Sequence, residues 1–144
     1  MELSKFAPSE PILVKAETTV LEAVTSMASK EAGAVVIVNS DRKIQGIFTE
    51  CDNVRRVTLK EKEPRVTPLG QVMTAPVMTV NVSASVDEAL SMMIRNRFGY
   101  LPVVDADNRI VGILSRRDLL MRRIGEKEAA LQTLEAFASA GGPG

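Results

Sequence analysis

Apolar and polar positions along this 144-residue chain follow an order that repeats after 66 residues. Aligning residues 3–56 with 69–122 needs no gap, and about 14 of the 54 pairs are identical. Most of these identities are core-type apolar residues or glycines, and chance would produce only a few. The two halves of the chain are therefore predicted to share one fold.

The first half of each copy predicts a short strand followed by a helix. Extended runs at Ile12–Val14 and Met78–Val82 precede segments whose apolar residues are spaced i, i+3, i+4 and i+7. Thr19 and Ser85 are each followed three positions later by a glutamate, which is typical of a capping box. Each helix is therefore expected to begin at this hydroxyl residue and to bury one face.

The second half of each copy predicts two strands and another helix. The apolar runs AVVIV and YLPVV lead through polar turns into KIQGIF and RIVGIL. Because proline lacks a backbone donor, Pro102 is expected to start its strand or to lie at the edge of the sheet. The second helices are predicted at Thr49–Val57 and Ser115–Arg123. The fold class is therefore α/β (α+β), with two tandem βαββα repeats and one shared core.

The repeats set the predicted domain boundaries. Repeat 1 covers 1–57, a charged and proline-interrupted linker covers 58–68, and repeat 2 covers 69–123. The remaining stretch, 124–144, predicts a third kind of helix with Leu131, Leu134 and Phe137 at helical spacing, and a disordered GGPG tail. Such a stripe packs either on its own chain, the more common arrangement, or on a partner.

Composition narrows the functional classes. Eighteen basic residues balance eighteen acidic ones, so we expect neither nucleic-acid nor membrane binding. The chain has no histidine and a single cysteine, Cys51, which disfavours zinc sites, hydrolytic triads and internal disulfides. No apolar run is long enough to span a membrane, and the first residues lack the pattern of a secretory signal. A cytoplasmic protein that is not an enzyme is expected.

The strand-to-helix junctions hold the most specific motif, G-h-h-[T/S]-x-x-D, in register in both copies. The glycine allows close approach to the backbone, the hydroxyl caps the helix, and the first-turn N–H groups favour an anion. An aspartate at this position can accept hydrogen bonds from a ribose diol. The motif therefore predicts a nucleotide site in each copy, at Gly46, Thr49 and Asp52 and at Gly112, Ser115 and Asp118.

The same spacing also fits a plain capping box, which needs no ligand. Both first helices use glutamate at this position, Glu22 and Glu88, and that side chain is long enough to reach back to the cap. Both second helices use the shorter aspartate. Because this difference is the same in the two copies, we favour a ligand role for the aspartates.

These motifs resemble the CBS (cystathionine-β-synthase) domain over roughly residues 3–123, most clearly in VMTVNVSASVDEAL and LPVVDADNRIVGILSRRDLL of the second copy. The resemblance implies that the repeats pack sheet to sheet with pseudo-twofold symmetry and leave two clefts. In many members these clefts hold AMP, ATP, S-adenosylmethionine or NAD. Such an adenosine compound would be a regulatory ligand and not a catalytic cofactor.

The resemblance also implies which candidate residues belong to each of the two clefts. It implies that Thr49 and Asp52 belong to one cleft and Ser115 and Asp118 to the other, and that the first strands contact the base through their main chain. The other candidates for ligand binding are Gly46, Gly112, Val14, Lys15, Ala16, Val80, Asn81, Val82, Tyr100, Pro102 and Arg116.

Two differences within the motif bear on phosphate binding. Many nucleotide-binding relatives have a basic residue just before the second strand, where this chain has Gly33-Ala34 and Gly99-Tyr100. Arg95 and Arg97 lie nearby and either substitute for it or, the more common arrangement, are solvated at the end of the helix. The second copy has Arg116-Arg117 where the first has Glu50-Cys51. The cleft of the second copy is therefore predicted to bind a phosphorylated ligand more tightly.

Two functions remain open. The favoured one is a non-catalytic regulatory module that senses an adenosine-type ligand and acts on an unidentified protein partner. The alternative is a protein-interaction or dimerisation scaffold with empty or vestigial clefts. In either case a homodimer is expected, because amphipathic helices on so small a pair of sheets leave apolar edges.

Overall fold

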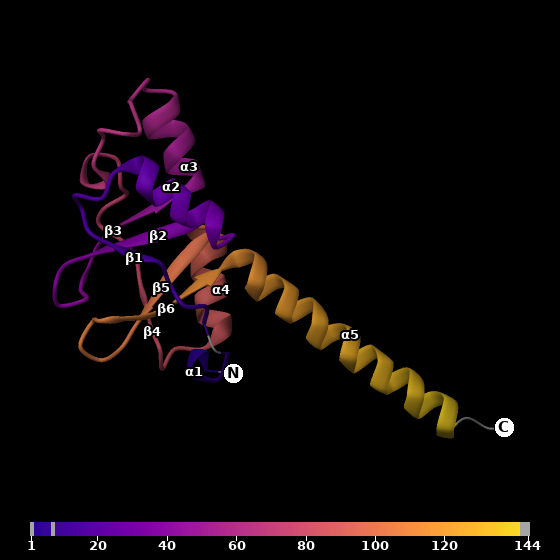
Figure 1. Ribbon diagram of the computed structural model, residues 1–144. Helices are drawn as coiled ribbons and strands as arrows, with labels where there is room; N and C mark the ends of the chain where they lie inside the picture. The colour runs from indigo at the N-terminus through magenta and orange to yellow at the C-terminus, as the bar shows by residue number, and fades with distance from the viewer. Residues whose placement is uncertain (1, 7, 142–144) are drawn as a thin grey trace.

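The computed structural model describes residues 2–6 and 8–141, which form two three-stranded sheets and their helices (Figure 1). In each sheet the middle strand runs parallel to the first strand and antiparallel to the last. This architecture confirms the predicted α+β class with two repeats. The strands are β1 (Leu13–Val14), β2 (Ala34–Val38) and β3 (Ile44–Thr49), then β4 (Val80–Asn81), β5 (Tyr100–Val104) and β6 (Ile110–Ser115).

Helices α2 and α4 start where the sequence predicts. The Thr19 hydroxyl accepts a hydrogen bond from the Glu22 amide at 3.2 Å, and the Ser85 hydroxyl accepts one from Glu88 at 3.0 Å. Each cap satisfies one of the amide donors that a helix start leaves free. The two helices span Val20–Ser29 and Val86–Asn96.

The two sheets face one another and carry a helix on their outer faces. Val36, Val38 and Ile110 are buried between the sheets. Val35 and Ile37 point to the opposite face of β2, where they pack with α2, and β5 packs with α4 in the same way. Because successive side chains of a strand alternate in direction, β2 contributes to two hydrophobic clusters at once.

The start of each repeat packs on the other repeat. Leu3, in the short helix α1 (Leu3–Phe6), is fully buried in the core of the second repeat. Leu69, which aligns with Leu3 after the 66-residue shift, lies in the 3-10 helix η2 (Leu69–Gln71) and is fully buried in the core of the first. The packed units therefore exchange their leading segments, and the boundaries 1–57 and 69–123 describe the sequence repeat only.

Pro102 lies inside the central strand β5, so the expectation of a strand start or a sheet edge is wrong. At the equivalent position, Val36 donates its N–H to the Ile12 carbonyl at 2.9 Å. Proline omits this bond at no cost to the rest of the ladder, because β4 pairs only with Val103 and Val104, beyond that point. Ile113, opposite Pro102, exchanges its backbone hydrogen bonds with Ser9.

The second helices differ between the repeats. In the first, α3 (Glu50–Asp52) continues as the π-helix η1 (Asn53–Thr58), close to the predicted bounds. In the second, the predicted helix and the predicted C-terminal helix form one helix, α5 (Arg116–Gly141). It projects from the module (Figure 1), and all residues from 124 to 138 are exposed, so the more common packing on its own chain is not found.

Two sequence expectations concern the end of the chain and membranes. The predicted disorder of GGPG falls almost wholly on 142–144, which lie outside the described residues. In the part that the structure describes, no helix combines the length and the apolar character needed to cross a bilayer.

Candidate functional site

Two pockets lie between the repeats and are related by the 66-residue shift. The larger, with a volume of about 730 Å³, contains Ser115 and Asp118 and is called the Asp118 pocket here. The smaller, of about 370 Å³, contains Thr49 and Asp52 and is called the Asp52 pocket.

Each pocket is built crosswise from both repeats. The Asp118 pocket combines the first turn of α5 with two segments of repeat 1, 9–12 and 30–34. The Asp52 pocket combines the first turn of α3 with two segments of repeat 2, 76–78 and 97–100. This follows from the exchanged leading segments, which run across the neighbouring repeat. One repeat alone would therefore form neither pocket.

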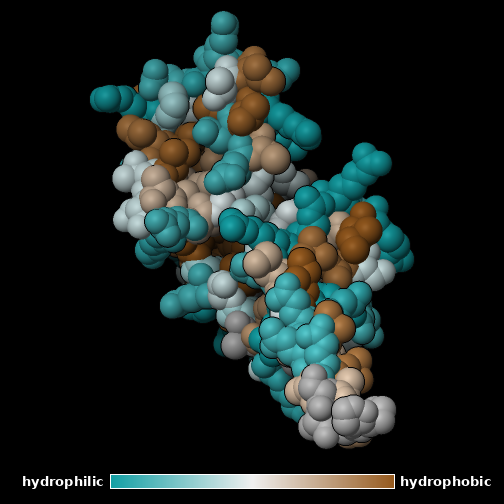
Figure 2. Space-filling view, turned by 90° about the vertical axis from the view of Figure 1, so that its right-hand side faces the viewer, coloured by the Kyte–Doolittle hydropathy of each residue, from teal (hydrophilic) through white to brown (hydrophobic). Residues whose placement is uncertain are grey.

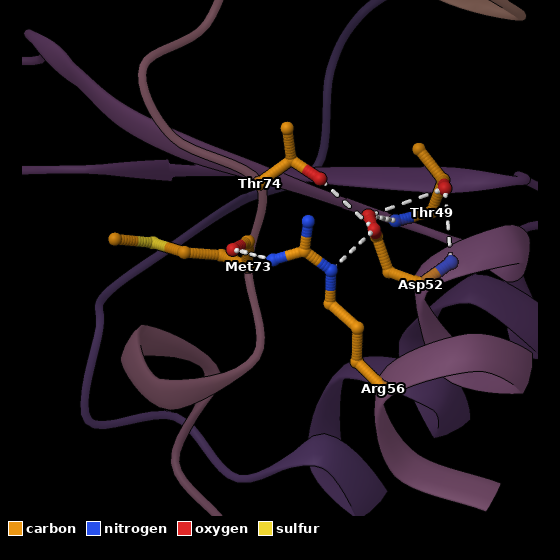
Figure 3. Close-up of polar contacts among 5 residues, drawn as sticks. All are labelled: Thr49, Asp52, Arg56, Met73 and Thr74. Carbon is orange, nitrogen blue, oxygen red and sulfur yellow. Dashed lines mark hydrogen bonds and ion pairs between the residues drawn. The ribbon is translucent and has the colours of Figure 1, made fainter. Parts of the chain in front are cut away.

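The Asp52 carboxylate is held by protein groups on both oxygens (Figure 3). Its side chain is buried, and Oδ2 accepts hydrogen bonds from the Thr49 N–H at 2.9 Å and the Thr49 hydroxyl at 3.3 Å. Oδ1 accepts from the Thr74 hydroxyl at 2.9 Å and forms an ion pair with Arg56 Nε at 3.5 Å. A ribose diol at this carboxylate would have to replace or share these partners.

Asp52 and Thr49 form a reciprocal capping box, in which the Asp52 amide also donates to the Thr49 hydroxyl at 3.4 Å. The inference that aspartate is too short to close such a box is therefore wrong for the first repeat. Arg56 extends the network by donating to the Met73 carbonyl at 2.9 Å. Asp52 thus fastens the helix of repeat 1 to the segment that leads into repeat 2.

The Asp118 carboxylate has no such partners. Ser115 caps α5 by accepting the Asp118 amide at 2.9 Å, but the exposed carboxylate makes no hydrogen bond or ion pair within the described residues. The position of Thr74 is occupied by Pro8, which has no hydroxyl. Arg122, which aligns with Arg56, lies 5.3 Å from the centre of the Phe6 ring and pairs with Glu126 at 3.5 Å.

Tyr100 lines both pockets. Its hydroxyl lies so close to Gly33 that a Cβ at position 33 would overlap it, whereas a Cβ at the equivalent Gly99 would meet no atom within 4 Å. Burial raises the pKa of the Tyr100 hydroxyl, and the nearby charges of Glu50 and Asp118 raise it further, with a smaller effect of Cys51. Tyr100 therefore stands where acidic groups of both pockets act on one phenol.

Gly46 and Gly112 allow a close approach, as predicted, but the approaching group is the protein itself. A Cβ at Gly46 would overlap the Met73 side chain, and one at Gly112 would come within 2.7 Å of Pro8. Met73 and Pro8 belong to the two exchanged leading segments. Neither glycine is among the residues that line the two pockets.

The remaining candidates divide clearly. Thr49, Asp52, Ser115, Arg116, Asp118 and Tyr100 line a pocket. The first-strand residues and the strand proline are outside both linings, namely Val14, Lys15, Ala16, Val80, Asn81, Val82 and Pro102. Of the two arginines considered as substitutes for the basic residue, Arg97 lines the Asp52 pocket and Arg95 lines neither.

Sequence reasoning missed the segments just before the first strands, 9–12 and 76–78, which form pocket walls. Their prolines, Pro11 and Pro76, indicate irregular backbone but give no sign of crossing to the other repeat. It also missed Lys30, which contributes a positive charge to the Asp118 pocket. The described residues hold no group of three or more acidic, cysteine or histidine side chains arranged for a metal ion.

Comparisons with known proteins agree on one family. A family model of the CBS domain matches residues 4–52 and 69–125. An uncharacterized 17.7 kDa protein of Acidianus ambivalens is 30% identical over 82% of this chain, which spans 70% of that protein. Two other curated relatives are longer, and the chain spans 24% and 21% of their lengths.

Solved structures show the same fold. An uncharacterized conserved protein from Pyrococcus horikoshii is 29% identical, with a TM-score of 0.77 over 85% of this chain and 91% of that one. The CBS domain pair of protein MJ0100 was solved in complex with 5′-methylthioadenosine and S-adenosyl-L-methionine. It is 24% identical, with a TM-score of 0.78 over 88% of this chain and 98% of that one, a likeness that concerns the fold.

Proposed function

The chain belongs to the CBS-domain family, and from this premise we propose that it is a non-catalytic regulatory module that binds an adenosine-type ligand in the Asp118 pocket. The observation that carries the proposal is the Asp118 carboxylate. It lines the larger pocket, beside the first turn of α5, and no described residue occupies its oxygens. The two hydroxyls of a ribose are suitable donors for such a carboxylate.

The lining of the Asp118 pocket includes the acidic side chains Glu10 and Glu31 as well as three basic ones, and the basic side chains can bind a phosphate group. Arg116 and Arg117 precede Asp118 in the first turn of α5, and Lys30 lies in the same pocket. The start of a helix also favours an anion through its free amide groups and its dipole. Adenosine monophosphate combines a diol for Asp118 with an anion for the basic groups, and we propose it as the ligand type. The adenosine compounds bound to MJ0100 support the nucleoside part of this assignment.

The Asp52 pocket supports a different role, and here the scaffold alternative is favoured. Its aspartate already binds Thr49, Thr74 and Arg56, and the space is about half that of the Asp118 pocket. We propose that Asp52 mainly stabilises the junction between the repeats. A nucleotide would then bind there more weakly than in the Asp118 pocket.

A regulatory module must also signal to another protein whether its ligand is bound. We propose that it does so in the cytoplasm as a homodimer that contacts a protein partner, through a ligand-dependent choice between two packings of the repeats. The exposed apolar side chains on the helices support such contacts. They include Leu21 on α2, Val54 on η1, Ile94 on α4 and Leu120 near the start of α5.

Titration calorimetry with AMP tests the site. Asp118→Ala should weaken AMP binding by about tenfold or more, because hydrogen bonds to a charged group contribute roughly 1.5–3 kcal/mol. Asp107→Ala, which removes an exposed aspartate outside both pockets, is the matched control and should bind like wild type. Asp52→Ala should lose less affinity than Asp118→Ala once both variants are shown to be folded.

Two results would contradict the proposal. Equal losses in Asp52→Ala and Asp118→Ala would remove the distinction between the pockets. A ligand that binds the folded state must stabilise it and raise the melting temperature. The scaffold function would be favoured if no adenosine compound raised the melting temperature at millimolar concentration, in a panel of AMP, ADP, ATP, NAD, S-adenosylmethionine and adenosine.

A further inference from the structure

Tyr100 lies where the two pockets adjoin. It lines both pockets, as does its neighbour Gly99. Its phenol reaches Gly33 of the other repeat, where an added Cβ would overlap the hydroxyl. The residue that aligns with Tyr100 in the first repeat is Ala34, which is buried and has no polar side-chain atom. The module therefore has one phenol for two pockets.

The Tyr100 hydroxyl is available to a ligand. Within the residues that the structure describes, it makes no hydrogen bond. Its surroundings belong to both pockets, because Glu50 lines the Asp52 pocket and Asp118 lines the larger one. Burial and then the charges of Glu50 and Asp118 raise the pKa of the hydroxyl, so it stays protonated far above neutral pH. A protonated phenol can donate only one hydrogen bond at a time.

The surroundings of Tyr100 suit a ligand that is partly apolar and partly polar. The face of the module from which α5 projects carries hydrophobic and hydrophilic residues side by side (Figure 2). The linings of the two pockets are mixed in the same way, with Ile113 and Lys30 in the larger and Phe98 and Arg97 in the smaller. AMP has an aromatic base for the apolar groups, and its base, ribose and phosphate all carry acceptors for a hydroxyl donor.

We propose that the Tyr100 hydroxyl is one donor shared by the two pockets, so that a ligand in one pocket withholds it from a ligand in the other. Such sharing rests on the proposed function, the binding of AMP between the repeats. The Asp118 pocket binds AMP first and takes the hydroxyl, and AMP then enters the Asp52 pocket without this bond. By thermodynamic linkage, each bound AMP weakens the binding of the other by the same factor. One neutral hydrogen bond makes this factor about two- to tenfold.

Titration calorimetry of Tyr100→Phe with AMP tests the bond, because phenylalanine keeps the ring against Gly33 and removes only the donor. The first step of AMP binding should become about two- to tenfold weaker, and the second step should stay as in wild type. An unchanged first step would mean that Tyr100 acts through its ring alone and would overturn the proposal.

A matched pair of pocket-filling variants tests the sharing. Asp118 and Cys51 are both exposed and line one pocket each, so Asp118→Trp and Cys51→Trp should each fill one pocket without disturbing the core. In Asp118→Trp, AMP should bind the Asp52 pocket more tightly than in the second step of wild type. Adding Tyr100→Phe should weaken this binding about two- to tenfold. In Cys51→Trp, the same addition should weaken AMP binding to the Asp118 pocket.

Failure of the sharing and failure of the proposed function give different results. If Asp118→Trp binds no AMP, or if Tyr100→Phe leaves AMP binding unchanged in that variant, the hydroxyl serves one pocket only and the sharing alone is overturned. If the wild-type chain binds no AMP, the proposed function is overturned, and the sharing with it.

Discussion

The two pockets have the same motif but use their aspartates differently. Asp52 is buried and forms a capping box with Thr49. It also accepts a hydrogen bond from Thr74 and forms an ion pair with Arg56. Asp118 is exposed, and no described residue binds its carboxylate. The two sequences G-h-h-[T/S]-x-x-D give no sign of this difference. A repeated motif can therefore stabilise the structure in one copy and present a binding group in the other.

The difference comes from residues outside the motif, on the exchanged leading segments and on the helices that follow the motif. Thr74 brings a hydroxyl to Asp52, whereas the equivalent Pro8 has none. Arg56 turns toward Asp52, whereas the equivalent Arg122 lies over Phe6 and pairs with Glu126. The role of each aspartate thus depends largely on the leading segment of the other repeat, which lies beside it.

The largest expected effect is on stability, and it separates the two aspartates. Asp52→Ala should lower the free energy of unfolding by about 2–3 kcal/mol, because a buried charged acceptor with several partly buried donors is lost. Asp118→Ala should change it by about 0.5 kcal/mol or less, as is usual for an exposed residue. Urea denaturation of both variants measures the difference. Equal destabilisation would mean that the two carboxylates have similar partners in solution.

The glycines beside Tyr100 offer a second contrast. Gly33→Ala should cost about 1–2 kcal/mol of unfolding free energy, since the new methyl group overlaps the phenol and forces it to move. Gly99→Ala, with open space around the added carbon, should be neutral or slightly stabilising. Thermal and urea denaturation give both values. In a Tyr100→Ala background the cost at position 33 should disappear, and its persistence there would show another cause.

Charge in the first helical turn should have a smaller effect, limited to ligand affinity. Arg116→Gln should weaken AMP binding about two- to fivefold at low salt, because one exposed charge near a helix start contributes roughly 0.3–1 kcal/mol. Glu50→Gln, the equivalent change in the Asp52 pocket, should leave the main AMP site unaffected. Calorimetry with AMP and with neutral adenosine separates the charge effect. A similar loss for adenosine would show that Arg116 acts through shape.

The smallest effect concerns Tyr100, whose ionisation can be followed alone because the chain has one tyrosine and no tryptophan. Ultraviolet titration should place its pKa above the ordinary value of 10.0, and Glu50→Gln and Asp118→Asn should each lower it. A pKa that is raised on folding means that the folded state holds the proton more firmly. Its contribution to stability should be complete below pH 10.0 and should be lost as the pH rises through the folded pKa. Tyr100→Phe should remove this alkaline loss.

The periodicity of apolar residues was sufficient to predict most helices and strands, because caps and spacing within a segment govern where these elements form. Hydroxyl caps at Thr19 and Ser85 and apolar residues at helical spacing predict α2 and α4 with little error. The same reasoning failed at Pro102, because a central strand can hold a proline only where the neighbouring strand does not need its N–H. Here β4 pairs only with Val103 and Val104, which the sequence does not reveal. The reasoning also failed for α5, because spacing shows that a helix has an apolar face but not where that face packs.

The sequence by itself determined the repeat, its elements, the family resemblance and the motif residues that line the two pockets. Only the tertiary structure showed that Leu3 packs in the core of the second repeat and Leu69 in the core of the first. It alone showed that residues of both repeats line each pocket. It also showed that protein groups bind the Asp52 carboxylate, whereas no described residue binds that of Asp118. The physical reason is that a local motif specifies which groups a residue offers, whereas their partners come from segments brought together only when the cores are buried.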